Sequence, residues 1–146
     1  MKTFLTLLAV LFSIPAFAGS ASAVIHVTAH VVNACEISQP PTIAFDNLDS
    51  AKGGSTSTSA GITCTKGATA AVRLVGPTEL SDGRGNTIPY VVTDGAGHPI
   101  NAMQGPSFTS ATALSPTLVP MTASIASGSR VPDGDYRSTL TLAVYF

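Results

Sequence analysis

Long hydrophobic runs, charged residues and cysteines are scarce in this sequence of 146 residues, and each scarcity excludes a class of protein. The longest apolar run, FLTLLAVLFSI, has about 11 residues, whereas a helix that crosses a membrane needs roughly 20. Charged residues make up 10% of the chain and nearly cancel, so no basic patch can hold the phosphates of a nucleic acid. Runs of helix-forming Glu, Lys, Leu and Arg are also missing after residue 18. Abundant Gly, Ser, Thr, Ala and Pro instead favour short strands joined by turns.

The amino-terminal run predicts export. Lys2 supplies a short basic region, the apolar run follows, and small residues flank Phe17 in the pattern AFA. This order is typical of a secretory signal peptide, which we assign to residues 1–18. Cleavage after Ala23 also fits, and Ala18 is preferred because it directly follows the apolar run. We therefore expect a soluble protein that is exported.

The exported part contains two cysteines, Cys35 and Cys64. In an oxidising compartment a single disulfide between them is the expected state. Closing a loop of about 30 residues stabilises a fold by roughly 3–4 kcal/mol in the chain-entropy model. A zinc site is disfavoured because no second Cys or His lies at metal-ligand spacing from either cysteine. The alternative is a pair of unpaired, buried thiols.

The exported part divides into short strand-like runs bounded by turn residues. Apolar and polar side chains alternate in three of them, at residues 23–32, 118–125 and 134–146, and the first is expected to continue through Cys35 to Ile37. Further strands are expected at 42–45, 61–65, 70–76 and 88–94. The stretch GGSTSTSAG at 53–61 is expected to be a flexible polar loop. About six or seven short strands without a helical segment predict an all-β, antiparallel β-sandwich in one domain.

Four stretches carry a resemblance to a known family. They are the alternating run that leads into NACEI, the second cysteine in GITCTKG, the central IPYVV and the terminal GDYRSTLTLAVYF. Together they resemble the spore coat protein U domain, the pilin domain of archaic chaperone-usher pili. The most specific part is the terminal pattern Gly-x-Tyr-x-x-Thr-Leu-x-Leu-x-Val-x-Phe, and the resemblance covers essentially the whole mature chain. Ser138 departs from it, since many relatives are expected to have Asp there.

The resemblance implies an incomplete immunoglobulin-like sandwich that is completed by a donor strand from a neighbouring subunit. Such pilins keep a hydrophobic groove beside the carboxyl-terminal strand. A periplasmic chaperone fills the groove first, and at an outer-membrane usher the amino-terminal extension of the next pilin replaces it by donor-strand complementation. The implied function is that of a structural pilus (fimbria) subunit at the cell surface, supporting adhesion and biofilm formation. No enzyme activity, cofactor or nucleic-acid partner is implied.

The resemblance also assigns roles to segments. Residues 1–18 are the signal peptide, 19–31 the donor-strand extension and 32–146 the pilin domain, with the second boundary falling between Ala29 and Asn33. The donor side chains are Ile25, Val27, Ala29 and Val31. The acceptor groove and chaperone edge comprise Tyr136, Leu140, Leu142, Val144 and Phe146. The sequence pattern supports both the acceptor and the donor assignment. Residues 134–146 have no strand after them in the sequence, and residues 23–32 lie outside the loop that the cysteines close. Such head-to-tail contacts do not close and therefore give a fibre.

Other functional patterns are weaker. His26 and His30 would lie about 13 Å apart on a strand, too far to share a metal ion. His98 and Asp94 fall in a turn without a nucleophile motif, and Asp133 and Asp135 suit a turn better than glycoside cleavage. The GRG at residues 83–85 is too short for a phosphate loop. The alternative to a pilin is a free secreted β-sandwich that binds a carbohydrate or a protein.

Overall fold

The computed structural model describes residues 19–146, so the predicted signal peptide lies outside the described residues. In this part of the chain no helix is long and apolar enough to cross a membrane. Val31–Phe146 form one compact unit. The strands are β1 (Cys35–Gln39), β2 (Gly54–Cys64), β3 (Thr69–Val75), β4 (Glu79–Ser81), β5 (Thr87–Pro89), β6 (Val91–Asp94), β7 (Ser107–Thr109), β8 (Thr117–Ile125) and β9 (Thr141–Tyr145).

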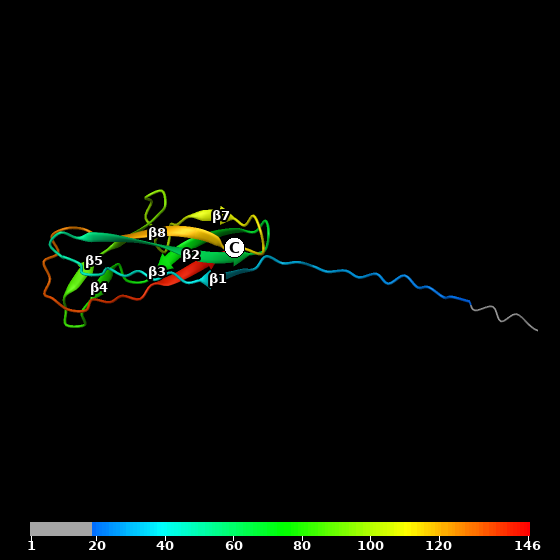
Figure 1. Cartoon of the computed structure of the whole chain (residues 1–146), viewed down its shortest axis with the longest axis horizontal. Coiled ribbons are helices and arrows are strands. Elements are labelled where there is room, and N and C mark those ends of the chain that lie inside the picture. Colours follow the sequence, from blue (N-terminus) through cyan, green and yellow to red (C-terminus); the bar gives the residue numbers. More distant parts are fainter. Residues whose placement is uncertain (1–18) are drawn as a thin grey trace, which may run out of the picture. The chain divides into compact units, whose positions relative to one another are not determined.

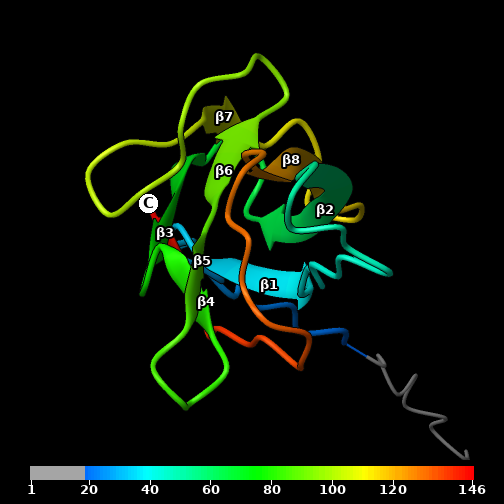
Figure 2. The ribbon, with the colours of Figure 1, turned by 90° about the vertical axis from the view of Figure 1, so that its left-hand side faces the viewer.

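The strands form antiparallel sheets in two layers, as predicted. One sheet has the order β1-β2-β8-β6 and the other β7-β3-β9, while β4 and β5 form a separate hairpin. Figure 1 shows these strands along the compact unit, and Figure 2 shows β3 and β7 on one side with β2 and β8 on the other. Because the sheets have separate edges, the arrangement is a sandwich and not a closed barrel.

Two clusters of buried side chains fill the space between the sheets. One includes Ile62 of β2, Val72 of β3 and Val119 of β8. The other includes Leu74 of β3 and Met121 of β8. Both clusters thus draw on both sheets, and the alternation predicted for 118–125 is confirmed by the buried side chains Val119, Met121, Ala123 and Ile125.

The prediction of a flexible loop at 53–61 was wrong. Residues 54–61 belong to β2, which pairs with β8 in an unbroken register from Gly54↔Ile125 to Ile62↔Thr117. Ser55, Ser57 and Ser59 are exposed on the outer face, whereas Ala60 is fully buried. The small polar residues therefore occupy the solvated face of a strand whose partner supplies most of the apolar surface.

The predicted disulfide is confirmed. Cys35 and Cys64 are direct cross-strand neighbours on β1 and β2, and their sulfur atoms are bonded at 2.08 Å. Cys64 is buried at the edge of the second core cluster. The bond therefore fixes β1 to the sheet next to the point where the amino-terminal segment joins the domain.

Four predicted strands differ from the structure. The single strand predicted at 88–94 is divided into β5, which pairs with β4, and β6, which pairs with β8. Of the strand predicted from residue 23 to Ile37, only Cys35–Ile37 belong to a strand, β1. Residues 23–34 form none, because an alternating segment without a ladder partner is not stable as a strand in water. Residues 42–45 also lie outside the strands, although Ile43 and Phe45 are half-buried. The terminal strand begins at Thr141 and not at residue 134, because the preceding residues pair only through the bridge between Ser81 and Arg137.

Candidate functional site

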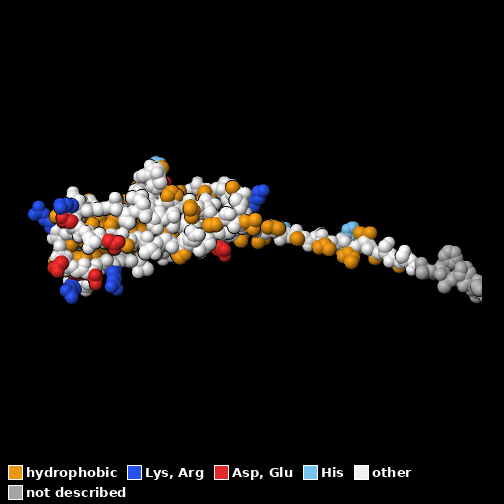
Figure 3. All heavy atoms as spheres, in the orientation of Figure 1, with side chains coloured by type: hydrophobic (Ala, Val, Ile, Leu, Met, Phe, Trp, Pro, Cys, Tyr) orange, Lys and Arg blue, Asp and Glu red, His pale blue; other side chains and the backbone are white. Residues whose placement is uncertain are grey.

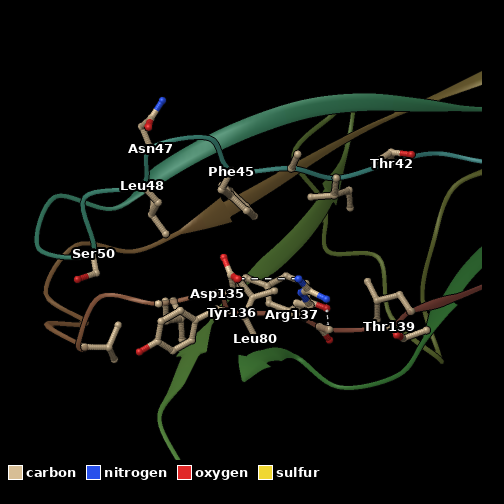
Figure 4. A pocket seen from close by; sticks show the side chains of 18 of the residues that line it. Thr42, Phe45, Asn47, Leu48, Ser50, Leu80, Asp135, Tyr136, Arg137 and Thr139 are labelled. Atoms are coloured by element: carbon tan, nitrogen blue, oxygen red, sulfur yellow. Dashed lines mark hydrogen bonds and ion pairs between the residues drawn. The ribbon is translucent and has the colours of Figure 1, made fainter. Parts of the chain in front are cut away.

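An open groove of about 1130 Å³ lies along one side of the domain. Residues 37–50 form one wall, and residues 131–142 form the other, while β4 and β5 contribute to the floor. Figure 4 shows Phe45 and Leu48 pointing from the first wall toward the segment that carries Tyr136 and Arg137. The groove is therefore built from segments that are far apart in the sequence.

The groove is an uncovered part of the hydrophobic core. Half-buried apolar side chains from both walls pack against the core cluster that contains Ile88 and Tyr90. They are Ile43, Phe45, Leu48, Leu80, Val131, Tyr136, Leu140 and Leu142. In a complete sandwich such side chains would be covered by a further strand, because the core of a sandwich is closed by both sheets. Here they remain accessible from the groove.

The groove also borders backbone edges that have no strand partner within the described part of the chain. β9 pairs with β3 and ends its sheet, and β1 ends the other sheet. Upstream of β9, the Arg137 N–H donates to the Ser81 carbonyl oxygen and the Ser81 N–H donates to the Arg137 carbonyl oxygen, both at 2.9 Å. Neighbouring residues of an extended segment direct their backbone groups to opposite sides, so those of Tyr136 and Ser138 face away from Ser81. Such an edge is a template for another strand.

Tyr90 holds the wall that precedes β9. Its side chain is 7% exposed, and its hydroxyl donates to the Pro77 carbonyl oxygen at 2.9 Å. The same hydroxyl lies 3.3 Å from Ser138 Oγ. The tyrosine therefore links the floor of the groove to the residue at which this chain departs from the expected family pattern.

Acidic groups dominate the charge along the groove. Its charged lining residues are Asp49, Asp133, Asp135 and Arg137. Partial burial raises the pKa of the Tyr136 phenol, and the nearby carboxylates of Asp82 and Asp133 raise it further. Hydrogen bonds from the Asn86 side chain and the Arg84 backbone N–H lower the pKa of Asp82, which therefore stays ionised. Figure 3 shows most of the charged side chains on the visible face gathered at one end of the domain, with hydrophobic side chains between them.

The residues predicted for the groove occupy different positions. Tyr136, Leu140 and Leu142 line it. Val144 packs instead against the second core cluster, and Phe146 is 59% exposed beyond β9. Their role as an acceptor edge stays a prediction.

Sequence reasoning missed the opposite wall and the floor, which include Phe45, Leu48, Leu80 and Tyr90. The alternation in TIAF was the available signal for the opposite wall, since Ile43 and Phe45 are half-buried while Thr42 and Ala44 are exposed.

The predicted donor side chains lie in an exposed segment. Ile25, Val27 and Val31 are 82%, 87% and 77% exposed, and Ala29 is exposed as well. Their donor role likewise stays a prediction.

The other candidate residues are not gathered into a site. His98 Nδ1 lies 3.5 Å from Asp94 Oδ2, and the His98 backbone N–H donates to Asp94 Oδ1 at 2.8 Å. These contacts close an exposed turn, and the backbone hydrogen bond is the main cause of the lowered pKa of Asp94. Across residues 19–146 no group of three or more His, Cys, Asp or Glu side chains could hold a metal ion.

Comparison with known proteins identifies a similar fold and a family. No curated protein matches the chain significantly. A chain in the crystal structure of the CsuC-CsuE chaperone-tip adhesion subunit pre-assembly complex, from archaic chaperone-usher Csu pili of Acinetobacter baumannii, is similar with a TM-score of 0.57 and 20% identity. The match covers 80% of this chain and 40% of that one, so this chain spans about two fifths of the solved chain's length. The family model described as Spore Coat Protein U domain matches residues 21–143, and the chain therefore belongs to this family.

Proposed function

We propose that this protein is a structural subunit of a chaperone-usher pilus that polymerises by donor-strand complementation. The observation that carries the proposal is the groove with half-buried apolar side chains beside the edge of β9 that has no strand partner in residues 19–146. An open core and an unpaired strand edge invite a strand from another chain, which can bury its apolar side chains and complete the backbone hydrogen bonds. Membership of the Spore Coat Protein U domain family supports this reading.

The amino-terminal extension, residues 19–31, is the proposed donor. Its alternating apolar side chains are exposed to water, including Val27 at 87%. Burying each of the larger ones contributes about 1.5–3 kcal/mol. The period of two places Ile25, Val27, Ala29 and Val31 on one face, which would enter the groove of the neighbour.

Ala34, just after the extension, and the groove wall formed by residues 131–140 lie at opposite ends of the domain. In the β3–β9 register, Ala71 pairs with Tyr145 and Val75 pairs with Thr141. The turn after β2, to which Ala34 is hydrogen-bonded, therefore lies toward the Tyr145 end, whereas residues 131–140 extend beyond the Thr141 end. A donor antiparallel to β9 would enter a neighbour from the Thr141 end, and repetition of this contact gives an open fibre.

The proposal includes further partners and a location. A periplasmic chaperone would occupy the groove before assembly, and an outer-membrane usher would be the place of exchange. The subunit would be exported and would end in a pilus that supports adhesion and biofilm formation. The solved neighbour comes from a chaperone-tip adhesion subunit complex, which is consistent with a chaperone partner for this chain. The proposed role requires no catalysis.

The experiment is to express Val27→Arg and Thr28→Arg together with the chaperone. A buried, unpaired charge costs several kcal/mol, so Val27→Arg should leave a soluble subunit–chaperone complex but no fibres. Thr28→Arg places the same charge on the opposite face of the donor strand and should polymerise. Unboiled gels and electron microscopy report the polymer as a ladder and as fibres.

Fibres from Val27→Arg at the wild-type level would contradict the donor role. Loss of the folded subunit in Val27→Arg alone would instead favour the free secreted β-sandwich that binds a carbohydrate or a protein. In that fold, Val27 would belong to the internal core.

A further inference from the structure

Lys66 lies beside the root of the extension, defined here as residues 31–34. The Thr65 backbone N–H donates to the Ala34 carbonyl oxygen at 2.9 Å, and the Ala34 N–H donates to Thr65 Oγ1 at 3.1 Å. Thr65 Oγ1 in turn donates to the Val32 carbonyl oxygen at 3.3 Å. Lys66 itself is exposed and belongs to none of the ion pairs described for residues 19–146. These bonds fix Thr65 against the root. The adjacent Lys66, which has no ion-pair partner in the described chain, therefore lies where the extension leaves the domain.

The groove has an uncommitted carboxylate at the other end of the domain. It is lined by three carboxylates and one guanidinium. Asp49 lies 3.4 Å from Lys52, and Asp135 lies 3.9 Å from Arg137. Asp133 is exposed and is absent from the ion pairs of the described chain. Of the three lining carboxylates, it is thus the one that remains available to a cation from outside.

The extension and its root complement this charge. Residues 19–34 contain no Asp or Glu. A donor that runs antiparallel to β9 places its last residues, and hence its root, at the end of the groove formed by residues 131–136. Because Thr65 is hydrogen-bonded to the root, the next residue, Lys66, is brought to the same end of the neighbour's groove.

We propose that Lys66 of one subunit pairs with Asp133 of a second copy at each junction of the fibre. This inference rests on the proposed function, because it requires the extension to enter the groove of the next copy. An exposed pair of this kind adds little to equilibrium stability and acts mainly on the association rate and its salt dependence. The pair therefore steers the two ends of the subunit toward each other and disfavours docking in the reverse direction.

The test is the rate at which the ladder forms from purified subunit–chaperone complexes at low and at high salt. Lys66→Glu should slow ladder formation about threefold or more at low ionic strength. Asp133→Lys should do the same, and the double variant Lys66→Glu/Asp133→Lys should recover most of the rate. Near 1 M salt, where the Debye length is about 3 Å, the rates should converge. The double variant Met103→Glu/Gln104→Glu changes the net charge as much as Lys66→Glu, but both residues are exposed in the loop between β6 and β7 and neither lines the groove, so it should show no such slowing.

Different outcomes separate this inference from the function beneath it. If the wild type forms a ladder and Lys66→Glu assembles at the same rate, or if the double variant is no faster than the single ones, the ion pair is overturned and the pilus function stands. Equal slowing by Met103→Glu/Gln104→Glu would assign the effect to net charge and would also overturn the pair. If the wild type forms no ladder, both proposals fall.

Discussion

At the scale of single residues, Tyr90 is the side chain that most directly shapes the groove. It is nearly buried, so its hydroxyl needs partners, and it finds them in the Pro77 carbonyl oxygen and Ser138 Oγ. The second contact ties the floor of the groove to the wall that precedes β9. The shape of an open groove depends on such ties because no strand covers it.

We predict that Tyr90→Phe destabilises the subunit and loosens the groove wall. Loss of a hydrogen bond of this kind costs about 0.5–1.5 kcal/mol. Thermal unfolding of the subunit should show the lower stability. Tyr145→Phe is the matched control, because no hydrogen bond of the Tyr145 hydroxyl is described and its ring, which stacks against Arg73, is retained. An equal effect of the two substitutions would contradict the role of the Tyr90 hydroxyl.

At the scale of elements, β9 is the strand with two environments. One edge pairs with β3 from Val75↔Thr141 to Ala71↔Tyr145, and the other edge is free in the described structure. Leu142 is half-buried and lines the groove, whereas Thr141 is exposed. Substitutions at Leu142 and Thr141 therefore compare the groove face with the solvent face of one strand.

Leu142→Lys should abolish binding of the chaperone, while Thr141→Lys should retain it. The reason is that Leu142→Lys removes apolar wall and brings a charge to a surface that must be desolvated when a strand docks. Soluble subunit–chaperone complex, recovered by co-purification from the periplasm, is the measurement. The Leu142→Lys subunit should be degraded. A normal yield of its complex would count against the groove as the docking surface.

Sequence reasoning succeeded where one strand face is apolar and failed where pairing decides the structure. The alternation in 118–125 predicted β8, because every second side chain is buried. The first half of β2 has only Ser, Thr and Gly. It forms a strand because it pairs with β8, so its own residues could not predict the strand. Conversely, Ile43 and Phe45 alternate like a strand but lack a ladder partner. The sequence therefore predicted a strand at 42–45 but did not assign these residues to the groove, whereas Leu140 and Leu142 were assigned to it.

At the scale of the whole molecule, the domain combines a fixed scaffold with an open core. The disulfide between Cys35 and Cys64 anchors β1 at one edge of the sandwich, and β9 ends the opposing sheet. Between the walls formed by residues 37–50 and 131–142, the groove exposes apolar side chains that pack against the larger core cluster. A domain of this size has little stability to spare, so an uncovered core should be its weakest part.

The central claim is that residues 19–31 of one copy complete the core of another. It is tested most directly by the thermal midpoint of a chain in which a second copy of residues 19–33 follows Phe146 through a short turn. This arrangement lets the added strand fold back antiparallel to β9. The midpoint should rise by about 10 °C or more over that of the unextended chain, because several apolar side chains become buried and a ladder is formed. The same chain with Val27→Arg in the added copy should lose most of that gain. An unchanged midpoint in the extended chain would contradict the claim.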